Sequence, residues 1–112
     1  MLIVDDHAPF RAVARTLLED AGYVVSGEAA DASEALAAVA VETPDAVLLD
    51  VQLPGADGFS VATALAVAGG PAIVLISSRE AEDYGRRIES CGARGFIPKS
   101  KLSAAAFAAL VE

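Results

Sequence analysis

The chain has 112 residues, the size of one ordinary domain and too short for two separate cores. Hydrophobic residues make up 54% and charged residues 21%, a globular balance, and no apolar run approaches the ~18 residues that a membrane span needs. The formal net charge of -8 would repel a phosphate backbone, so direct nucleic-acid binding is disfavoured. The absence of an export signal at the start, together with the lone Cys91, predicts a cytoplasmic protein.

Short apolar runs alternate with segments of helical spacing along the chain. The first predicted strand, residues 2–4, precedes a helix whose apolar residues recur at positions 10, 13, 17 and 18 and which stops near Gly22. The second strand, residues 23–25, precedes a helix that starts from the capping pair Asp31 and Glu34 and runs to residue 40. The remaining predicted elements are strands at 46–49, 72–76 and 95–97, and helices at 58–68, 82–91 and 103–111.

This pattern predicts a single (βα)5 domain over residues 1–112. Strands joined by single helices run parallel, with helices covering both faces of the sheet, so the fold class is α/β in three layers. All strand carboxyl ends then share one edge, which is where open α/β sheets bind ligands. The polar residues that follow the predicted strands are Asp5, Asp6, Asp50, Ser77 and Lys99.

Three carboxylates brought close together repel one another unless a cation neutralises them. Oxygen ligands with no His or Cys cluster favour Mg²⁺ over zinc. Lys99 adds a positive charge and Ser77 a hydroxyl donor, both suited to the oxygens of a transferring phosphoryl group. The residues therefore predict phosphoryl transfer, with Asp50 as the nucleophile that forms an acyl phosphate.

The stretches "LIVDD", "LLDVQLPGADGF" and "GFIPKS" resemble the receiver domain of bacterial two-component response regulators over essentially the whole chain. The resemblance includes Pro54 and Gly58, four and eight residues after the acceptor aspartate. It implies a flavodoxin-like fold with strand order 2-1-3-4-5. The start "VDDHAPFR" is similar to the nitrate-response-regulator subfamily, whose receivers usually precede a helix-turn-helix DNA-binding domain.

The resemblance also implies the site's division of labour. Asp6, Asp50 and the backbone carbonyl of Gln52 bind Mg²⁺ directly, and Asp5 binds it through water. Asp50 accepts phosphate from the phosphohistidine of a sensor histidine kinase, with Lys99 and Ser77 contacting the phosphoryl group.

Two further roles follow from the resemblance. Ser77 moves toward the phosphoryl group and Phe96, which lacks a tyrosine hydroxyl, turns inward, changing the surface of the fourth helix, fifth strand and fifth helix. Gln52 and Arg79 flank the phosphoryl position and tune its hydrolysis. Unlike many receivers, the chain has Ser100 rather than proline after Lys99, so a different local loop is expected.

The expected partners are a histidine kinase and, on phosphorylation, a second copy of the chain, with no membrane partner. DNA would be contacted only through a helix-turn-helix domain, of which residues 1–112 show no pattern, and the expected output is transcriptional control. The expected activity is limited to self-phosphorylation from a donor and autodephosphorylation, so the chain is not predicted to be an enzyme.

Each residue has a structural alternative, since Asp5 and Asp6 could cap a helix, Asp50 could be a turn residue and Phe96 plain core. Two functional alternatives also stand. A phosphohydrolase with an aspartyl nucleophile is disfavoured because Gln52 occupies the position where such enzymes carry a second Asp. The hypothesis of a degenerate receiver that acts only by binding is weak, because every position needed for phosphotransfer carries the expected residue type.

Overall fold

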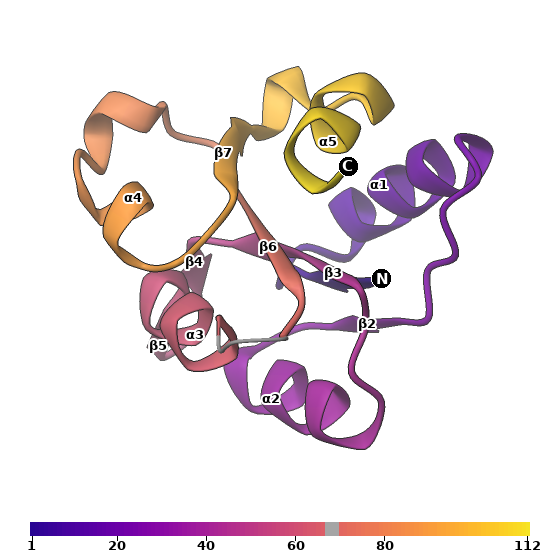
Figure 1. Ribbon diagram of the computed structural model, residues 1–112, viewed down its shortest axis with the longest axis horizontal. Coiled ribbons are helices and arrows are strands. Elements are labelled where there is room, and N and C mark those ends of the chain that lie inside the picture. The colour runs from indigo at the N-terminus through magenta and orange to yellow at the C-terminus, as the bar shows by residue number, and fades with distance from the viewer. Residues whose placement is uncertain (67–69) are drawn as a thin grey trace.

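A parallel sheet of five strands forms the centre of the computed structural model, which describes residues 1–66 and 70–112 (Figure 1). The strands are β1 (Leu2–Val4), β2 (Gly27–Ala29), β3 (Ala46–Asp50), β6 (Ala72–Ser77) and β7 (Gly95–Pro98). Their order β2-β1-β3-β6-β7 is the predicted 2-1-3-4-5 order, and every pair is parallel. The flavodoxin-like α/β fold is therefore confirmed.

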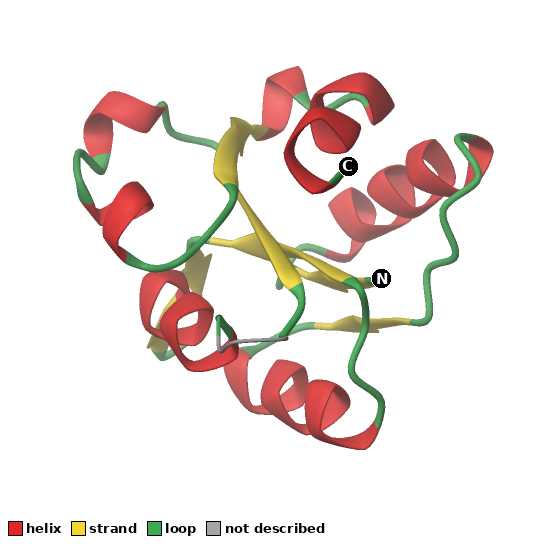
Figure 2. Cartoon of the chain, viewed as in Figure 1, coloured by secondary structure: helices red, strands yellow, loops and turns green. Residues whose placement is uncertain are grey.

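Helices cover both faces of this sheet, which makes three layers (Figure 2). The α-helices are α1 (Ala8–Asp20), α2 (Ala32–Val41), α3 (Gly58–Leu65), α4 (Arg87–Ser90) and α5 (Ala104–Val111), and two 3-10 turns are η1 (Ala81–Asp83) and η2 (Lys99–Lys101). The Asp31 side chain accepts the Glu34 N–H at 2.8 Å, so the predicted cap of α2 is confirmed. Among the described residues, no helix has the length and apolarity to cross a bilayer.

Side-chain alternation along the strands divides the core into two layers. Leu48 of β3 packs on one side of the sheet with Leu18 and Phe107, and this side is the α1/α5 face. Its neighbours Val47 and Leu49 pack on the opposite side with α2, α3 and α4, the α2–α4 face. Because both faces are covered, the central strands are continuous apolar runs, which is why they were readable from the sequence.

The second strand is not where the sequence predicted it. Residues 23–25 lie outside the ladder, with Val24 77% exposed and Val25 buried on the α1/α5 face, and β2 begins at Gly27. An edge strand needs no apolar residue on its outer side, and Glu28 of β2 instead pairs with Arg11 at 3.0 Å. The prediction followed hydrophobicity, whereas the residues that pair are polar or small.

Two of the predicted helices are shorter than expected. In place of a helix over 82–91, the chain forms η1, a turn and then α4 of four residues. Gly85 interrupts the segment with φ +58°, a left-handed conformation that favours glycine. The helix predicted over 58–68 ends at Leu65, with Ala66 as its C-cap, and residues 67–68 lie outside the described residues.

The Pro/Gly-rich turn after β3 is a small antiparallel hairpin of β4 (Gln52–Leu53) and β5 (Ala56–Asp57). Gly55 turns it with φ +66°. Gly58, the first residue of α3, packs so closely on the end of β3 that an added Cβ would lie 2.4 Å from the Asp50 carbonyl oxygen. Only glycine fits there, so Gly58 sets how near α3 comes to Asp50.

Candidate functional site

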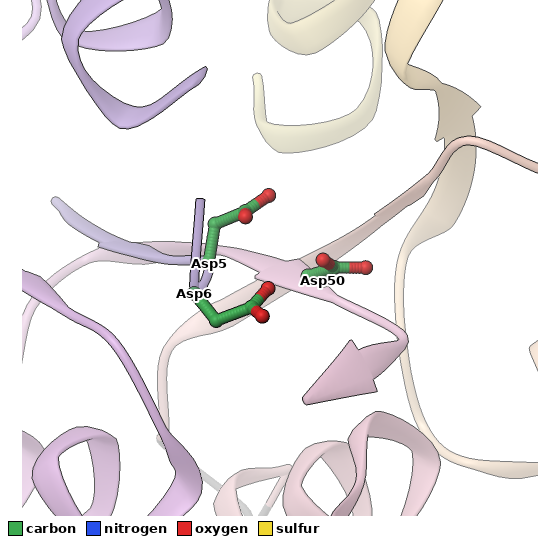
Figure 3. A group of neighbouring side chains, drawn as sticks. All are labelled: Asp5, Asp6 and Asp50. Atoms are coloured by element: carbon green, nitrogen blue, oxygen red, sulfur yellow. The ribbon is translucent and has the colours of Figure 1, made fainter. Parts of the chain in front are cut away.

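Strand register brings the predicted polar residues to one edge of the sheet. Val4 of β1 pairs with Leu49 of β3, so Asp5 and Asp50 follow on adjacent strands. Asp50 pairs with Ile76 of β6, the residue before Ser77. The carboxylates of Asp5, Asp6 and Asp50 each place an oxygen within 4.8 Å of the other two (Figure 3). The predicted acidic cluster therefore forms, with oxygen ligands only.

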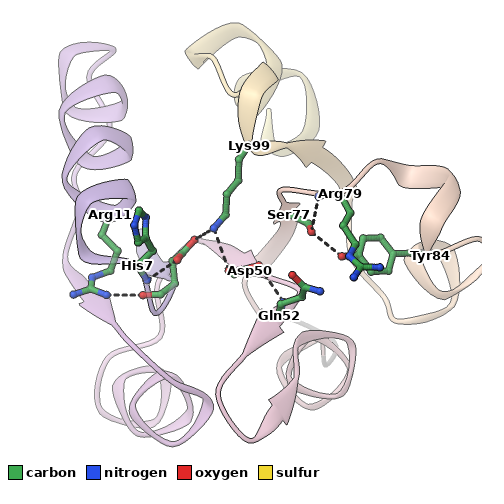
Figure 4. A network of polar contacts seen from close by, with 9 residues as sticks. His7, Arg11, Asp50, Gln52, Ser77, Arg79, Tyr84 and Lys99 are labelled. Atoms are coloured by element: carbon green, nitrogen blue, oxygen red, sulfur yellow. Dashed lines mark hydrogen bonds and ion pairs between the residues drawn. The ribbon is translucent and has the colours of Figure 1, made fainter.

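Asp50 is 4% exposed and held by two donors. Its Oδ1 accepts the Gln52 backbone N–H at 3.0 Å, and its Oδ2 accepts a hydrogen bond from Lys99 Nζ at 3.2 Å (Figure 4). Burial and the nearby charge of Asp5 raise the pKa of Asp50, and the Gln52 N–H and Lys99 offset only part of that rise. The fold thus makes this carboxylate more basic than an ordinary aspartate.

Asp5 is completely buried beside the first turn of α1. Its Oδ1 accepts a hydrogen bond from the His7 N–H at 2.8 Å, and its backbone carbonyl accepts one from the Arg11 guanidinium at 2.5 Å. Its Oδ2 lies 2.6 Å from Lys99 Nζ, yet receives no aligned hydrogen bond from the described residues. A close ionic contact with Lys99 therefore holds this oxygen, and a carboxylate oxygen has a further lone pair that can accept a hydrogen bond.

Lys99 reaches the cluster from the end of β7. Its ammonium contacts Asp5 and Asp50 and lies 4.6 Å from the centre of the Phe10 ring. Burial is the largest single influence on the pKa of Lys99 and lowers it, but the two carboxylates together raise that pKa above its ordinary value. Lys99 is therefore positively charged at neutral pH. In the described part of the chain, the peptide bond between Lys99 and Ser100 is trans, and η2 forms there.

Ser77, at the end of β6, is fully buried but turned away from the acidic cluster. Its hydroxyl lies 2.7 Å from the hydroxyl of Tyr84 and accepts the Arg79 N–H at 3.1 Å. The Tyr84 ring packs between Phe59 and Phe96, with centroid distances of 5.3 and 5.7 Å. Ser77 therefore contacts a cluster of aromatic side chains on the α2–α4 face.

The structure thus brings together Asp5, Asp6, Asp50, Lys99 and the Gln52 N–H, and it leaves Ser77 with Tyr84. Asp5 and Asp6 do not cap α1 themselves, because its N-cap is His7 without a side-chain bond, although Asp5 fixes the His7 N–H. The backbone N–H of Arg79 donates a hydrogen bond to the Ser77 hydroxyl. Asp6 and Gln52 have exposed side chains beside the buried Asp50.

Three contacts of the site were not anticipated from the sequence. Tyr84 lay inside a predicted helix, and nothing in the pattern marked its hydroxyl as a partner of Ser77. The helical spacing predicts Phe10 on the apolar side of the first helix and does not predict its contact with Lys99. Arg11 has no predicted role, although it lies one helical turn after His7, the N-cap of α1. Only the spacing of Arg11 offered a usable signal.

Comparison with known proteins identifies the class. The model of the response regulator receiver domain family matches residues 1–110, and the chain belongs to this family. Receiver domains serve two-component signalling, are generally partnered by a histidine kinase and bind Mg²⁺ at an acidic pocket, and they are generally not enzymes that act on separate substrates. The resemblance drawn from the motifs is confirmed, and family membership does not favour the phosphohydrolase alternative.

Individual relatives agree with this assignment. The chain is 31% identical to the transcriptional regulatory protein PdtaR of Mycobacterium tuberculosis over 88% of its own length and 48% of that protein. It spans about half the length of several curated relatives that it matches.

Solved structures agree as well. The NarL signal receiver domain of M. tuberculosis superposes with a TM-score of 0.83 at 31% identity, covering 97% of this chain and 93% of that one. The chemotaxis response regulator CheY4 of Vibrio cholerae has a TM-score of 0.84 at 26% identity, covering 97% and 95%.

Proposed function

We propose that Asp50 accepts a phosphoryl group from the phosphohistidine of a sensor histidine kinase. The observation that carries the proposal is the placement of the buried Asp50 carboxylate, with Lys99 Nζ at 3.2 Å and two further carboxylates within 4.8 Å. In the reaction, an Asp50 oxygen attacks phosphorus, the phosphorus–nitrogen bond breaks, and its electron pair leaves with the imidazole. Lys99 offsets the charge of the phosphoryl oxygens, with Ser77 as a second contact after it moves.

The residues present fit a magnesium ion. The donor set is all oxygen, and buried Asp5 Oδ2 keeps an unused acceptor position. Asp6, Asp50 and the Gln52 carbonyl would hold the ion directly and Asp5 through water. When bound, Mg²⁺ supplies positive charge that offsets the carboxylates and the phosphoryl oxygens. The chain's own part is to hold three carboxylates together despite their repulsion.

The response to phosphorylation is proposed to pass through Ser77 and Phe96 to the surface of α4, β7 and α5. This surface would form a homodimer or an output contact, and the output is proposed to be transcriptional because several relatives of about twice this length are named transcriptional regulators. DNA contact would require a helix-turn-helix domain.

The proposed location is the cytoplasm, where the chain would meet the kinase. Gln52 and Arg79 would tune the lifetime of the acyl phosphate, and the chemistry would be confined to autophosphorylation and autodephosphorylation.

Intact-mass measurement after incubation with acetyl phosphate and Mg²⁺ tests the acceptor role. Wild type should gain one phosphate that hydroxylamine removes, and Asp50→Asn should gain none. Asp57→Asn is the matched control, because Asp57 is an exposed carboxylate that caps α3 and Asn can also cap. Phosphate on the Asp50→Asn protein, or none on wild type, would contradict the proposal.

A further inference from the structure

We infer that the hydroxyl of Tyr84 holds Ser77 in the state without a phosphoryl group, and that its release couples Asp50 to the segment before α4. Tyr84 would thus be a positioning residue, and the inference rests on the proposed function of Asp50. The juxtaposition that carries it is the 2.7 Å contact between the Ser77 and Tyr84 hydroxyls.

Strand alternation explains why Ser77 must move. Leu75 of β6 faces the α2–α4 layer and Ile76 faces the α1/α5 layer, so Ser77 returns to the α2–α4 side. Figure 4 shows its hydroxyl directed to Tyr84, while Lys99 and Asp50 contact one another from the ends of β7 and β3. A Ser77 that turns to a phosphoryl group on Asp50 gives up the Tyr84 contact, whichever hydroxyl donates.

The hydrogen bonds of Ser77 set up a competition with the phosphoryl group. A serine hydroxyl donates one hydrogen bond and accepts two, and a phosphoryl oxygen only accepts. Ser77 Oγ accepts the Arg79 N–H at 3.1 Å and also contacts Tyr84. A phosphoryl oxygen therefore competes for the Ser77 proton where Ser77 donates to Tyr84, and where Tyr84 donates, the contact is lost because Ser77 turns away from it. Because Ser77 is fully buried, water does not readily replace a lost partner, so the Tyr84 bond stabilises the unphosphorylated arrangement.

Tyr84 is also placed to transmit the change. It follows η1 directly, three residues before α4, and its ring contacts Phe59 of α3 and Phe96 of β7. Phe96 has no hydroxyl, so the phenol bound to Ser77 comes from this segment and not from β7. Release of the bond frees the hydroxyl end of a ring that packs against both neighbours, so a shift of Tyr84 would change the packing around Phe96.

The test uses Tyr84→Phe, which removes the hydroxyl and keeps the ring. The probe is beryllium fluoride with Mg²⁺, a phosphoryl mimic, titrated by NMR at the Gln52 amide. Loss of a hydrogen bond made only in the free state should lower the titration midpoint by about two- to tenfold. Tyr23→Phe is the matched control, because that hydroxyl bonds Glu112, away from the acidic cluster, and its loss should leave the midpoint unchanged.

A second pair of variants separates this role from a packing effect. In a Ser77→Ala background, Tyr84→Phe should have no effect on the midpoint, because the partner hydroxyl is already gone. An unchanged or higher midpoint in Tyr84→Phe alone, or an effect that persists without Ser77, would overturn the inference while the acceptor role of Asp50 stands. Failure of wild type to bind the probe would instead overturn the proposed function, and this inference with it.

Discussion

The two faces of the sheet differ in how firmly they hold the site. On the α1/α5 face, α1 has 13 residues and its first turns contact Asp5 through Arg11 and Lys99 through Phe10. On the α2–α4 face, the element next to Ser77 is a 3-10 turn followed by a four-residue helix. Neither η1 nor α4 has a buried residue, whereas α1 buries Ala14 and Leu18, so the segment beside Ser77 is held by less packing than α1 is.

The same division runs through the candidate site. Asp5, Asp50 and Lys99 contact one another on the α1/α5 side, whereas Ser77 and Phe96 meet Tyr84 on the other. The carboxylates, which repel one another, lie beside the long helix α1. Ser77 and Phe96, which are proposed to move, lie beside the short helix α4. The difference teaches that one sheet edge can join side chains held beside a long helix to side chains that are proposed to move, because alternate residues point to opposite layers.

The largest expected effect comes from breaking the α1/α5 face. Phe107 is fully buried there, so Phe107→Ala should lower the free energy of unfolding by about 3–5 kcal/mol. Ile88 of α4 is only partly buried, and Ile88→Ala should cost roughly 1–2 kcal/mol. Urea unfolding measures both. Equal costs for the two substitutions would contradict the contrast between a helix that buries a large side chain and the short helix α4.

Removal of the Lys99 ammonium tests whether the charged side chains beside α1 carry out the phosphoryl transfer. Lys99→Met leaves Asp5 and Asp50 without their shared ammonium, and the rate of phosphate uptake from acetyl phosphate should fall about 100-fold. Lys101→Met, an exposed lysine in the same turn, should change the rate little. Circular dichroism would check that both variants are folded. A wild-type rate in Lys99→Met would show that the ammonium is not needed.

The close approach of α3 to the site gives a smaller effect. Gly58→Ala places a Cβ 2.4 Å from the Asp50 carbonyl oxygen and 2.6 Å from Val51 Cα, so backbone must shift. A loss of about 1–3 kcal/mol in unfolding free energy is expected. The control is Gly27→Ala in β2, where the new Cβ would meet only Leu2 Cδ1 at 3.6 Å. Comparable losses in both would mean that close packing at Gly58 is not what requires glycine.

The smallest expected effect is the pH dependence of stability that the buried Asp50 causes. Because burial first, and then Asp5, raise the pKa of Asp50, the folded state binds its proton more tightly than the unfolded chain does. Ionised Asp50 therefore lowers stability at neutral pH, and this cost disappears as the pH falls through the raised pKa toward the ordinary value. Asp50→Asn should unfold at higher urea concentration than wild type at neutral pH, with the gap closing in acid. A gap that widens in acid would reverse the sign.

Much of this architecture is local in origin and could be predicted. The runs that became β3 and β6 are buried on both faces, so their apolar character is continuous, and the polar residue that ends each one marks the sheet edge. The Asp31 cap was recognisable because it spans only three residues. The strand at 23–25 was misplaced because an edge strand such as β2 shows no apolar signature.

The roles of Asp50, Ser77 and the magnesium ligands stay predictions, although the meeting of Asp5, Asp6 and Asp50 at one sheet edge was anticipated. Parallel pairing brings the ends of β1 and β3 together whatever the helices between them contain, so Asp5 and Asp50 met as expected. The helix predicted over 82–91 failed because Gly85 takes a positive φ that periodicity does not reveal.

What the sequence determined by itself was the alternation of strands and helices, and with it the edge on which the carboxylates and Lys99 meet. The tertiary structure alone decided which residues face which layer at that edge. It placed the Tyr84 hydroxyl on Ser77, a contact that joins the end of β6 to a segment after η1. The physical reason is that backbone pattern follows from local preference and burial, whereas a bond between two side chains depends on how separate layers pack.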